Sequence, residues 1–135
     1  MIDFNLLTDT AICPTRGSAY SVGYDLYCPV NTLLCAQSTS KISLGISLVM
    51  DNYSLWAQIM DRSSLGKVGL HVFGGVVDPD YTGEICVLIH NTNKHDIQVE
   101  QGDRIAQMTF HPAITFDAET PKHVRGTGGF GSTGV

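Results

Sequence analysis

The sequence predicts an all-β protein: a jelly-roll-like β-sandwich with one short helix and an extended C-terminal arm. Three observations support this prediction. Short apolar runs rich in strand-forming residues recur along the chain, turn-forming residues separate them, and only one short stretch suggests a helix. The 135 residues, 43% of them hydrophobic, are enough for the core of one domain. We therefore expect a β domain at residues 1–110 and an arm at 111–135.

Six segments carry the strand signal, with Gly, Pro, Asn and Asp marking turns. In EICVLIH (84–90) both alternating sets of side chains are largely apolar, so one face is predicted to enter the core and the other to meet another subunit. The turn residues in 78–83 and 100–104 predict two hairpins. The six segments are YDLYCPVN (24–31), KISLGISLVMDN (41–52), SLWAQIMD (54–61), GLHVFGGVVDPDYTG (69–83), EICVLIHNTN (84–93) and DIQVEQGDRIAQMTF (96–110).

The helical signal is SSLGK (63–67), in which Ser63 or Ser64 is predicted to cap a short turn whose free N–H groups suit an anion. From 111 to 124, two prolines and the lack of a sustained period indicate an extended arm. At full extension these residues span roughly 45 Å. The arm is therefore long enough to carry the last residues onto a neighbouring subunit.

The composition argues against two classes of partner. A net charge of −5 with eight Lys and Arg lacks the basic face that nucleic-acid binding needs. No run of about eighteen apolar residues is present, so we expect no membrane segment. The cysteines form no C-x-x-C pair and are expected to be reduced, mostly buried thiols. We expect a cytoplasmic protein, or a nuclear one if its source is eukaryotic or viral.

The sequence ends in RGTGGFGSTGV (125–135). A loose terminus without a function is one interpretation, because glycine has the most conformational freedom to lose. The alternative is a ligand-binding segment, in which the glycines allow close backbone approach and Arg125, Ser132 and Thr133 are donors suited to a polyphosphate. The ring of Phe130 can then lie flat on a base.

Five segments resemble, in order and spacing, the five motifs of the homotrimeric deoxyuridine triphosphatase (dUTPase) family. They are VGYDL (22–26), DRSS (61–64), GGVVDPDYTGE (74–84), GDRIAQ (102–107) and RGTGGFGSTG (125–134). The resemblance implies hydrolysis of dUTP to dUMP and pyrophosphate by attack of water on the α-phosphorus, with Mg²⁺ on the triphosphate. It also implies a homotrimer in which each site takes its third motif, its phosphate-binding motifs and its tail from different subunits.

The third motif is implied to carry the chemistry. Asp78 matches the carboxylate that activates the attacking water as general base, although an Asp before Pro is, taken alone, more often a turn former. Tyr81 matches the tyrosine that packs under the deoxyribose and leaves no room for a 2′-hydroxyl. Taken alone, Tyr81 is interpreted as an aromatic residue of a turn that covers the edge of the core. The residues implied to contact uracil through the backbone are Gly75, Val76, Val77 and Cys86.

The other motifs are implied to bind the triphosphate and the metal. Asp25 matches the acid that holds Mg²⁺ through water, consistent with an ion that keeps much of its hydration. In the tail, Arg125 and Ser132 are implied to clamp the γ-phosphate while Phe130 stacks on uracil and Gly131 brings the backbone close. The residues implied to bind the remaining phosphate oxygens are Arg62, Ser63, Ser64 and Gln107.

Three positions depart from the family pattern, of which Val22, in place of the usual alanine, is a mild change in packing. Asp61 stands where proline is usual before Arg62, and we expect these two side chains to pair. Phe73 replaces a residue that is commonly smaller. Asp103 and Arg104 are expected to shape their hairpin through local charge pairs.

Two alternatives to a dUTPase remain open. The related dCTP deaminases share the fold and several motifs, although the glycine-phenylalanine tail matches the triphosphatase better. A dUTPase-like binding protein without activity is the other alternative, and the presence of Asp78 and Arg125 argues against it.

Overall fold

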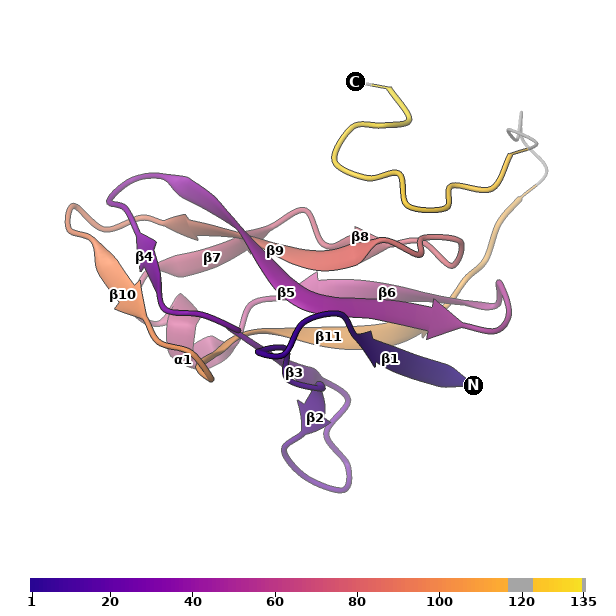
Figure 1. Ribbon diagram of the computed structural model, residues 1–135, viewed down its shortest axis with the longest axis horizontal. Coiled ribbons are helices and arrows are strands. Elements are labelled where there is room, and N and C mark those ends of the chain that lie inside the picture. The colour runs from indigo at the N-terminus through magenta and orange to yellow at the C-terminus, as the bar shows by residue number, and fades with distance from the viewer. Residues whose placement is uncertain (117–122, 135) are drawn as a thin grey trace.

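The computed structural model describes residues 1–116 and 123–134 (Figure 1). Strands and tight turns make up most of this part of the chain. The strands are β1 (Ile2–Leu6), β2 (Thr15–Arg16), β3 (Tyr24–Tyr27), β4 (Thr32–Leu34), β5 (Thr39–Met50), β6 (Leu55–Met60), β7 (Leu70–Phe73), β8 (Val76–Val77), β9 (Glu84–Asn91), β10 (Ile97–Val99) and β11 (Arg104–Pro112), and the helix is α1 (Ser63–Gly66).

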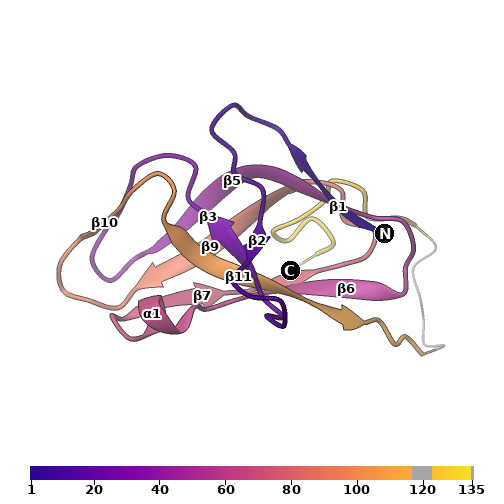
Figure 2. The ribbon, with the colours of Figure 1, turned by 90° about the horizontal axis from the view of Figure 1, so that it is seen from below.

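Two antiparallel sheets form a sandwich. One sheet has the strand order β1-β5-β9-β7 and the other β2-β3-β11-β6-β8, while β10 and β4 pair as a separate ribbon. Turning the molecule from the view of Figure 1 to that of Figure 2 brings β11 and β3 in front of β5 and β9, as expected for stacked layers. The predicted all-β sandwich with one short helix is confirmed for the described residues.

The core lies between the two layers, and β9 shows how the sequence builds it. Ile85, Val87 and Ile89 are at most 1% exposed, whereas Cys86 and Leu88 on the opposite face stay partly exposed. Burial of one such aliphatic side chain contributes about 1.5–3 kcal/mol. The same core cluster takes Leu26, Ala57, Ile105 and Met108 from the second sheet.

The two predicted hairpins are wrong, although their turns are present. The turn after β8 leads to β9, but β8 pairs with β6 and β9 pairs with β5 and β7, so residues 78–83 cross from one sheet to the other. Likewise β10 pairs with β4, whereas β11 pairs with β3 and β6. Turn residues determine a local reversal of the backbone, while the choice of pairing partner depends on side-chain packing from distant segments.

The predicted serine cap of α1 is also wrong. The residue at the N-cap is Arg62, and no side chain caps the helix. The Arg62 guanidinium is instead turned toward Asp25 on β3. With only four residues, α1 gains little from a cap and is placed by its contacts with β7.

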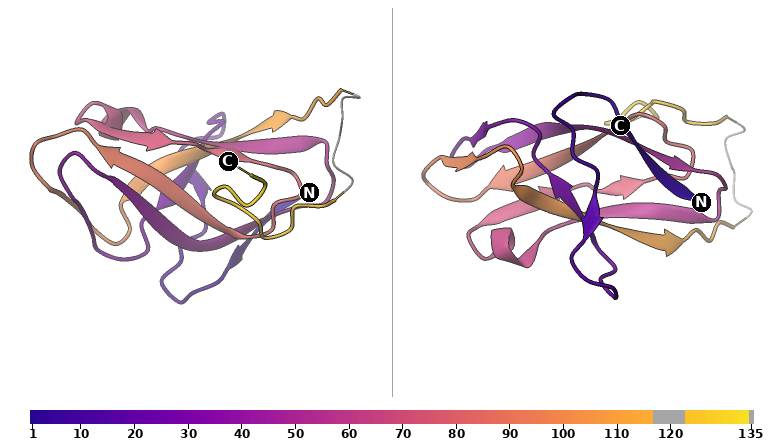
Figure 3. Two further views of the ribbon diagram at one scale, coloured as in Figure 1. Left: turned by 90° about the horizontal axis from the view of Figure 1, so that it is seen from above. Right: turned by 60° about the horizontal axis from the view of Figure 1, so that its bottom comes forward.

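The C-terminal segment 123–134 lies across β5 and β9 (Figure 3, left). The arm reaches it from the end of β11 through residues 117–122, which lie outside the described residues. All four cysteines are free thiols, as predicted, but the prediction that they are mostly buried is wrong, because only Cys28 is buried while Cys13 and Cys35 are exposed. Within the described ranges, no helix is long and apolar enough to cross a membrane.

Candidate active site

Most of the predicted site residues line two separate pockets, and Asp78, Gly131 and Ser132 line neither. The first, the apolar pocket, has a volume of about 240 Å³ and is formed by the β7–β8 junction, the start of β9 and the tail. The second, the polar pocket, has a volume of about 450 Å³ and lies between β3, α1 and β11. The apolar pocket contains Gly75, Val76, Val77, Tyr81, Cys86, Arg125 and Phe130. The polar pocket contains Asp25, Arg62, Ser63, Ser64 and Gln107.

Two glycines at the β7–β8 junction give the apolar pocket its floor. Gly74 and Gly75 have φ angles of 69° and 107°, which a residue with a side chain rarely adopts. A Cβ on Gly75 would lie 2.3 Å from the carbonyl oxygen of Ile59, so the close contact between β6 and this junction requires glycine. Phe73, just before the glycines, lines the pocket and stacks on His90 with ring centroids 5.3 Å apart.

Tyr81 forms one wall of the apolar pocket. Its hydroxyl donates a hydrogen bond of 2.8 Å to the carbonyl of Glu84, which fixes the ring. Burial raises the pKa of the Tyr81 phenol, Cys86 and Glu84 raise it further, and Arg125 lowers it in part. The side chain therefore remains a neutral phenol near neutral pH, and its contribution to the pocket is one of shape.

Asp78 follows the end of β8, lines a further hollow with Asp80, Arg125 and Thr133 beside the apolar pocket, and is paired with the tail. The guanidinium of Arg125 donates through Nη1 to the Asp78 carboxylate, whose side chain is 44% exposed. The Arg125 Nε atom is buried and has no hydrogen-bond partner among the described residues. An unpartnered buried donor costs free energy, so this guanidinium is only partly satisfied by Asp78.

Backbone hydrogen bonds attach the tail to the turn after β8. The amide of Arg125 donates to the Asp80 carboxylate at 2.6 Å, and the Thr82 amide donates to the carbonyl of Gly126 at 2.7 Å. Gly126 also forms a parallel β-bridge with Tyr81. The tail therefore closes over the apolar pocket of its own chain. Ser132 and Gly131 belong to this segment but are exposed.

In the polar pocket a carboxylate lies between two guanidinium groups. Asp25 is 13% exposed and accepts from Arg62 Nε at 2.9 Å and from Arg104 Nη1 at 3.3 Å. The predicted pairing of Arg104 with Asp103 is therefore wrong; Asp103 accepts from the Glu100 amide and closes the turn. Two cations and one anion leave this pocket positive, which suits an anionic ligand.

Asp61, which replaces the proline usual in the family, makes contacts that the sequence did not reveal. Its carboxylate accepts the backbone N–H of Val72 and approaches His71 Nδ1 at 3.3 Å, so the predicted pair with Arg62 is wrong. Its carbonyl accepts from Gln107 Nε2 at 2.8 Å. Asp61 thus connects the segment that leads into α1 with both β7 and β11 through hydrogen bonds.

Gly23 is a site residue that sequence reasoning missed. A Cβ at this position would lie 2.1 Å from Gln107 Oε1, so glycine is needed for the amide to lie here. The signal was present as the glycine of VGYDL, beside the acid Asp25.

The described residues offer no protein-only metal site. No group of three or more His, Cys, Asp or Glu side chains within residues 1–116 and 123–134 is arranged to hold an ion. Both oxygens of Asp25 already accept from guanidinium groups. The residues of the polar pocket therefore fit Mg²⁺ only if phosphate oxygens and water are its direct ligands. Asp25 would then accept a hydrogen bond from a water molecule bound to the ion.

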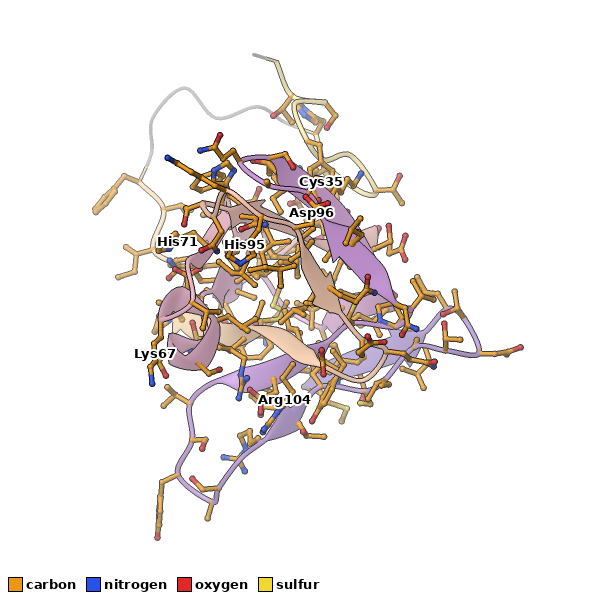
Figure 4. The ribbon with its side chains drawn as sticks, turned by 90° about the vertical axis from the view of Figure 1, so that its left-hand side faces the viewer. Cys35, Lys67, His71, His95, Asp96 and Arg104 are labelled. Carbon is orange, nitrogen blue, oxygen red and sulfur yellow. The ribbon has the colours of Figure 1, made fainter. Side chains whose placement is uncertain are left out.

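The pockets have no lining residue in common among the described residues. In Figure 4 the tail lies at the top of the molecule, while Arg104 and Lys67, beside the polar pocket, lie lower down. The fold therefore does not bring the residues of the two pockets together within one chain.

Fold and pockets together define a β-sandwich protein with a small apolar pocket, a separate cationic pocket and a glycine-rich tail over the first. A family model described as dUTPase matches residues 9–134. The deoxyuridine 5'-triphosphate nucleotidohydrolase of Paramecium bursaria Chlorella virus 1 is 37% identical, covering 96% of this chain and 94% of the relative. That of Arabidopsis thaliana is 39% identical, covering 96% and 80%. The chain belongs to the dUTPase family.

Solved structures show the same fold at lower identity. A variant of the dUTPase from phage phi11 of S. aureus, with a structural Mg(II) ion, has a TM-score of 0.82 at 18% identity and covers 93% of this chain and 99% of its own. A dUTPase variant of Staphylococcus bacteriophage 80alpha with dUpNHpp has a TM-score of 0.81 at 21% identity, covering 100% and 99%.

Proposed function

We propose that the protein hydrolyses dUTP to dUMP and pyrophosphate by attack of water on the α-phosphorus. The observation that carries this proposal is that Tyr81 and Arg125 line the apolar pocket while Asp78 pairs with Arg125 beside it, all on segments that match the dUTPase motifs. The names of its relatives supply the substrate class. The apolar pocket would take uracil and deoxyribose, and the polar pocket the phosphates.

The base would be held between small residues and backbone groups. Gly75, Val76 and Val77 leave a narrow slot, and Cys86 lies on the facing strand β9. Phe130 would stack on the base from the tail. A narrow slot of this kind disfavours a 5-methyl group, because bulk added to a close-packed site is costly.

The phosphates would be bound by donors from the polar pocket and the tail. Arg62, Ser63, Ser64 and Gln107 offer guanidinium, hydroxyl and amide groups around the same hollow. Arg125 would move from Asp78 to the γ-phosphate, where its unpartnered Nε would gain an acceptor. Ser132 would add a hydroxyl to the same phosphate.

Asp78 would act as the general base. Transfer of Arg125 to phosphate frees the carboxylate to orient a water molecule and accept its proton as the oxygen attacks the α-phosphorus. Pyrophosphate then leaves and its charge is stabilised by the cationic groups of the site. Mg²⁺ bound to the triphosphate would neutralise charge on the phosphate oxygens, with Asp25 holding its hydration water.

A site of this kind needs more than one chain. Because the two pockets are separate in one chain, we propose that the protein forms a homotrimer in which the polar pocket of one subunit faces the apolar pocket of another. The partly exposed second face of β9, with Cys86 and Leu88, lies at the apolar pocket. Subunit contacts there would complete the site.

Purified protein with Mg²⁺ is expected to release pyrophosphate from dUTP and not from dCTP. With oxygen-18 water the label is expected in dUMP, because water attacks the α-phosphorus. Release of ammonia from dCTP would favour the deaminase alternative. Failure to convert dUTP by correctly assembled protein would contradict the proposal.

Replacement Tyr81→Ala is expected to weaken the discrimination between dUTP and UTP by about tenfold or more, since the ring no longer fills the space of a 2′-hydroxyl. The ratio of kcat/KM for the two nucleotides measures this effect. Tyr81→Phe is the matched control, because it keeps the ring and loses only the hydrogen bond to Glu84. An unchanged ratio in Tyr81→Ala would rule out steric exclusion by this ring.

A further inference from the structure

A lysine outside the dUTPase motifs contacts the aromatic ring of the tail. Lys41 Nζ lies 3.9 Å from the centroid of the Phe130 ring. Lys41 is on β5, directly opposite Leu88 of β9, and Leu88 lines the apolar pocket. The Lys41 ammonium group therefore lies at the edge of the apolar pocket. Figure 3 shows the tail crossing β5 and β9 on this face of the molecule.

The position of the Phe130 ring is determined by its backbone as well. Phe130 has a φ of 53°, in the left-handed region that residues other than glycine rarely adopt. Its neighbour Gly129 lies against the Tyr81 ring, where a Cβ would be 3.3 Å from a ring carbon. A strained conformation of this kind persists only where the surroundings hold it. Lys41 and Tyr81 are such surroundings, on either side of the tail segment.

The charge of Lys41 is available for this contact. No ion pair of Lys41 with a carboxylate is present within residues 1–116 and 123–134. Its side chain is exposed, and Phe130 is 56% exposed. A cation over an aromatic face is attracted by the quadrupole of the ring, and an ammonium group without a carboxylate partner keeps that attraction.

We propose that Lys41 is a positioning residue that holds Phe130 over the apolar pocket and so keeps the tail closed. The role of Lys41 in closing the tail is inferred from the tail contacts in the structure. The effect of Lys41 on catalysis rests on the proposed dUTP hydrolysis. Lys41 acts through Phe130 and not through the phosphates. Its loss therefore shifts the tail toward the open state and leaves the chemical step unchanged.

The first test needs no substrate. Hydrogen exchange is measured at two backbone amides of the free protein. The Thr82 amide donates to the carbonyl of Gly126, and the Gly126 amide donates to the carbonyl of Asp80. Both amides lose their protection from exchange when the tail opens. Lys41→Ala is expected to speed their exchange by about fivefold, the size of an exposed cation–π contact. Lys41→Arg should keep the protection. Lys94→Ala is the matched control, since the β9–β10 loop lies at the opposite end of the molecule from the tail (Figure 1). Equal exchange in Lys41→Ala and the wild type would overturn the proposal.

The second test is a double-mutant cycle in dUTP hydrolysis. Lys41→Ala is expected to raise KM by about fivefold with little change in kcat, and to have no further effect in a Phe130→Leu background. If Lys41→Ala raises KM equally in the wild-type and Phe130→Leu backgrounds, the proposal is overturned and a contact of Lys41 with the nucleotide is indicated. If the protein does not hydrolyse dUTP, the exchange measurement still decides the role of Lys41, so the two proposals fail separately.

Discussion

Asp78→Asn is expected to lower kcat for dUTP by about a thousandfold, because the amide cannot take the proton of the attacking water. Binding of a non-hydrolysable analogue such as dUpNHpp should be equal to or tighter than that of the wild type. The reason is the ion pair in which Arg125 neutralises Asp78. Once the carboxylate is gone, Arg125 no longer has to leave it to reach the phosphate.

Steady-state kinetics together with analogue binding separate these two effects. Asp9→Asn is the matched control, since Asp9 is an exposed carboxylate outside both pockets. Wild-type rates in Asp78→Asn would remove this residue from the mechanism. Weaker binding of the analogue would contradict the competition between Asp78 and phosphate for Arg125.

Deletion of residues 125–135 is expected to reduce kcat/KM by about a hundredfold or more, since it removes the proposed phosphate ligand Arg125 and the proposed stacking ring of Phe130 together. The fold should persist, because no residue of the tail belongs to the hydrophobic core cluster. The midpoint of thermal unfolding is expected to stay within about 4 °C of the wild-type value.

Thr127→Ala is the control within the same segment, because the Thr127 side chain makes no hydrogen bond with the described residues. Its activity should match the wild type. A truncated protein that folds and retains full activity would contradict the role of the tail as a lid.

The sequence was most informative where a pattern is local. Apolar alternation in 84–90 correctly predicted that one face of this strand enters the core, and the structure shows that this is the face of Ile85 and Val87. The two hairpins were wrong, because turn residues show where the backbone reverses and not which strands pair across the sandwich. Strand pairing is a non-local property of the packed sheets.

The ionic partners were the least predictable part of the site. Asp61 and Arg62 are adjacent in sequence, yet Asp61 bonds to β7 and Arg62 to Asp25 on β3. Adjacent residues point in different directions in an extended segment, so neighbours in sequence are poor guides to charge pairs. The contact between Lys41 and Phe130 joins residues far apart along the chain and was not foreseen.

The central claim is that one reaction site combines the apolar pocket of one subunit with the polar pocket of another, and mixed assemblies test it directly. Asp78→Asn removes the proposed base beside the apolar pocket and Arg62→Gln removes a guanidinium of the polar pocket, so each variant alone should be almost inactive. Chains carrying different tags are refolded together and the mixed assemblies are purified through both tags, which ensures that every measured assembly contains both variants.

In a cyclic trimer that contains both variants, one of the three sites always joins an intact apolar pocket to an intact polar pocket, which is about one third of the sites. Mixed assemblies are therefore expected to recover a corresponding fraction of wild-type dUTP hydrolysis. Activity no higher than the sum of the two inactive variants would contradict the account, because it would mean that a single chain supplies both Asp78 and Arg62 to the same site.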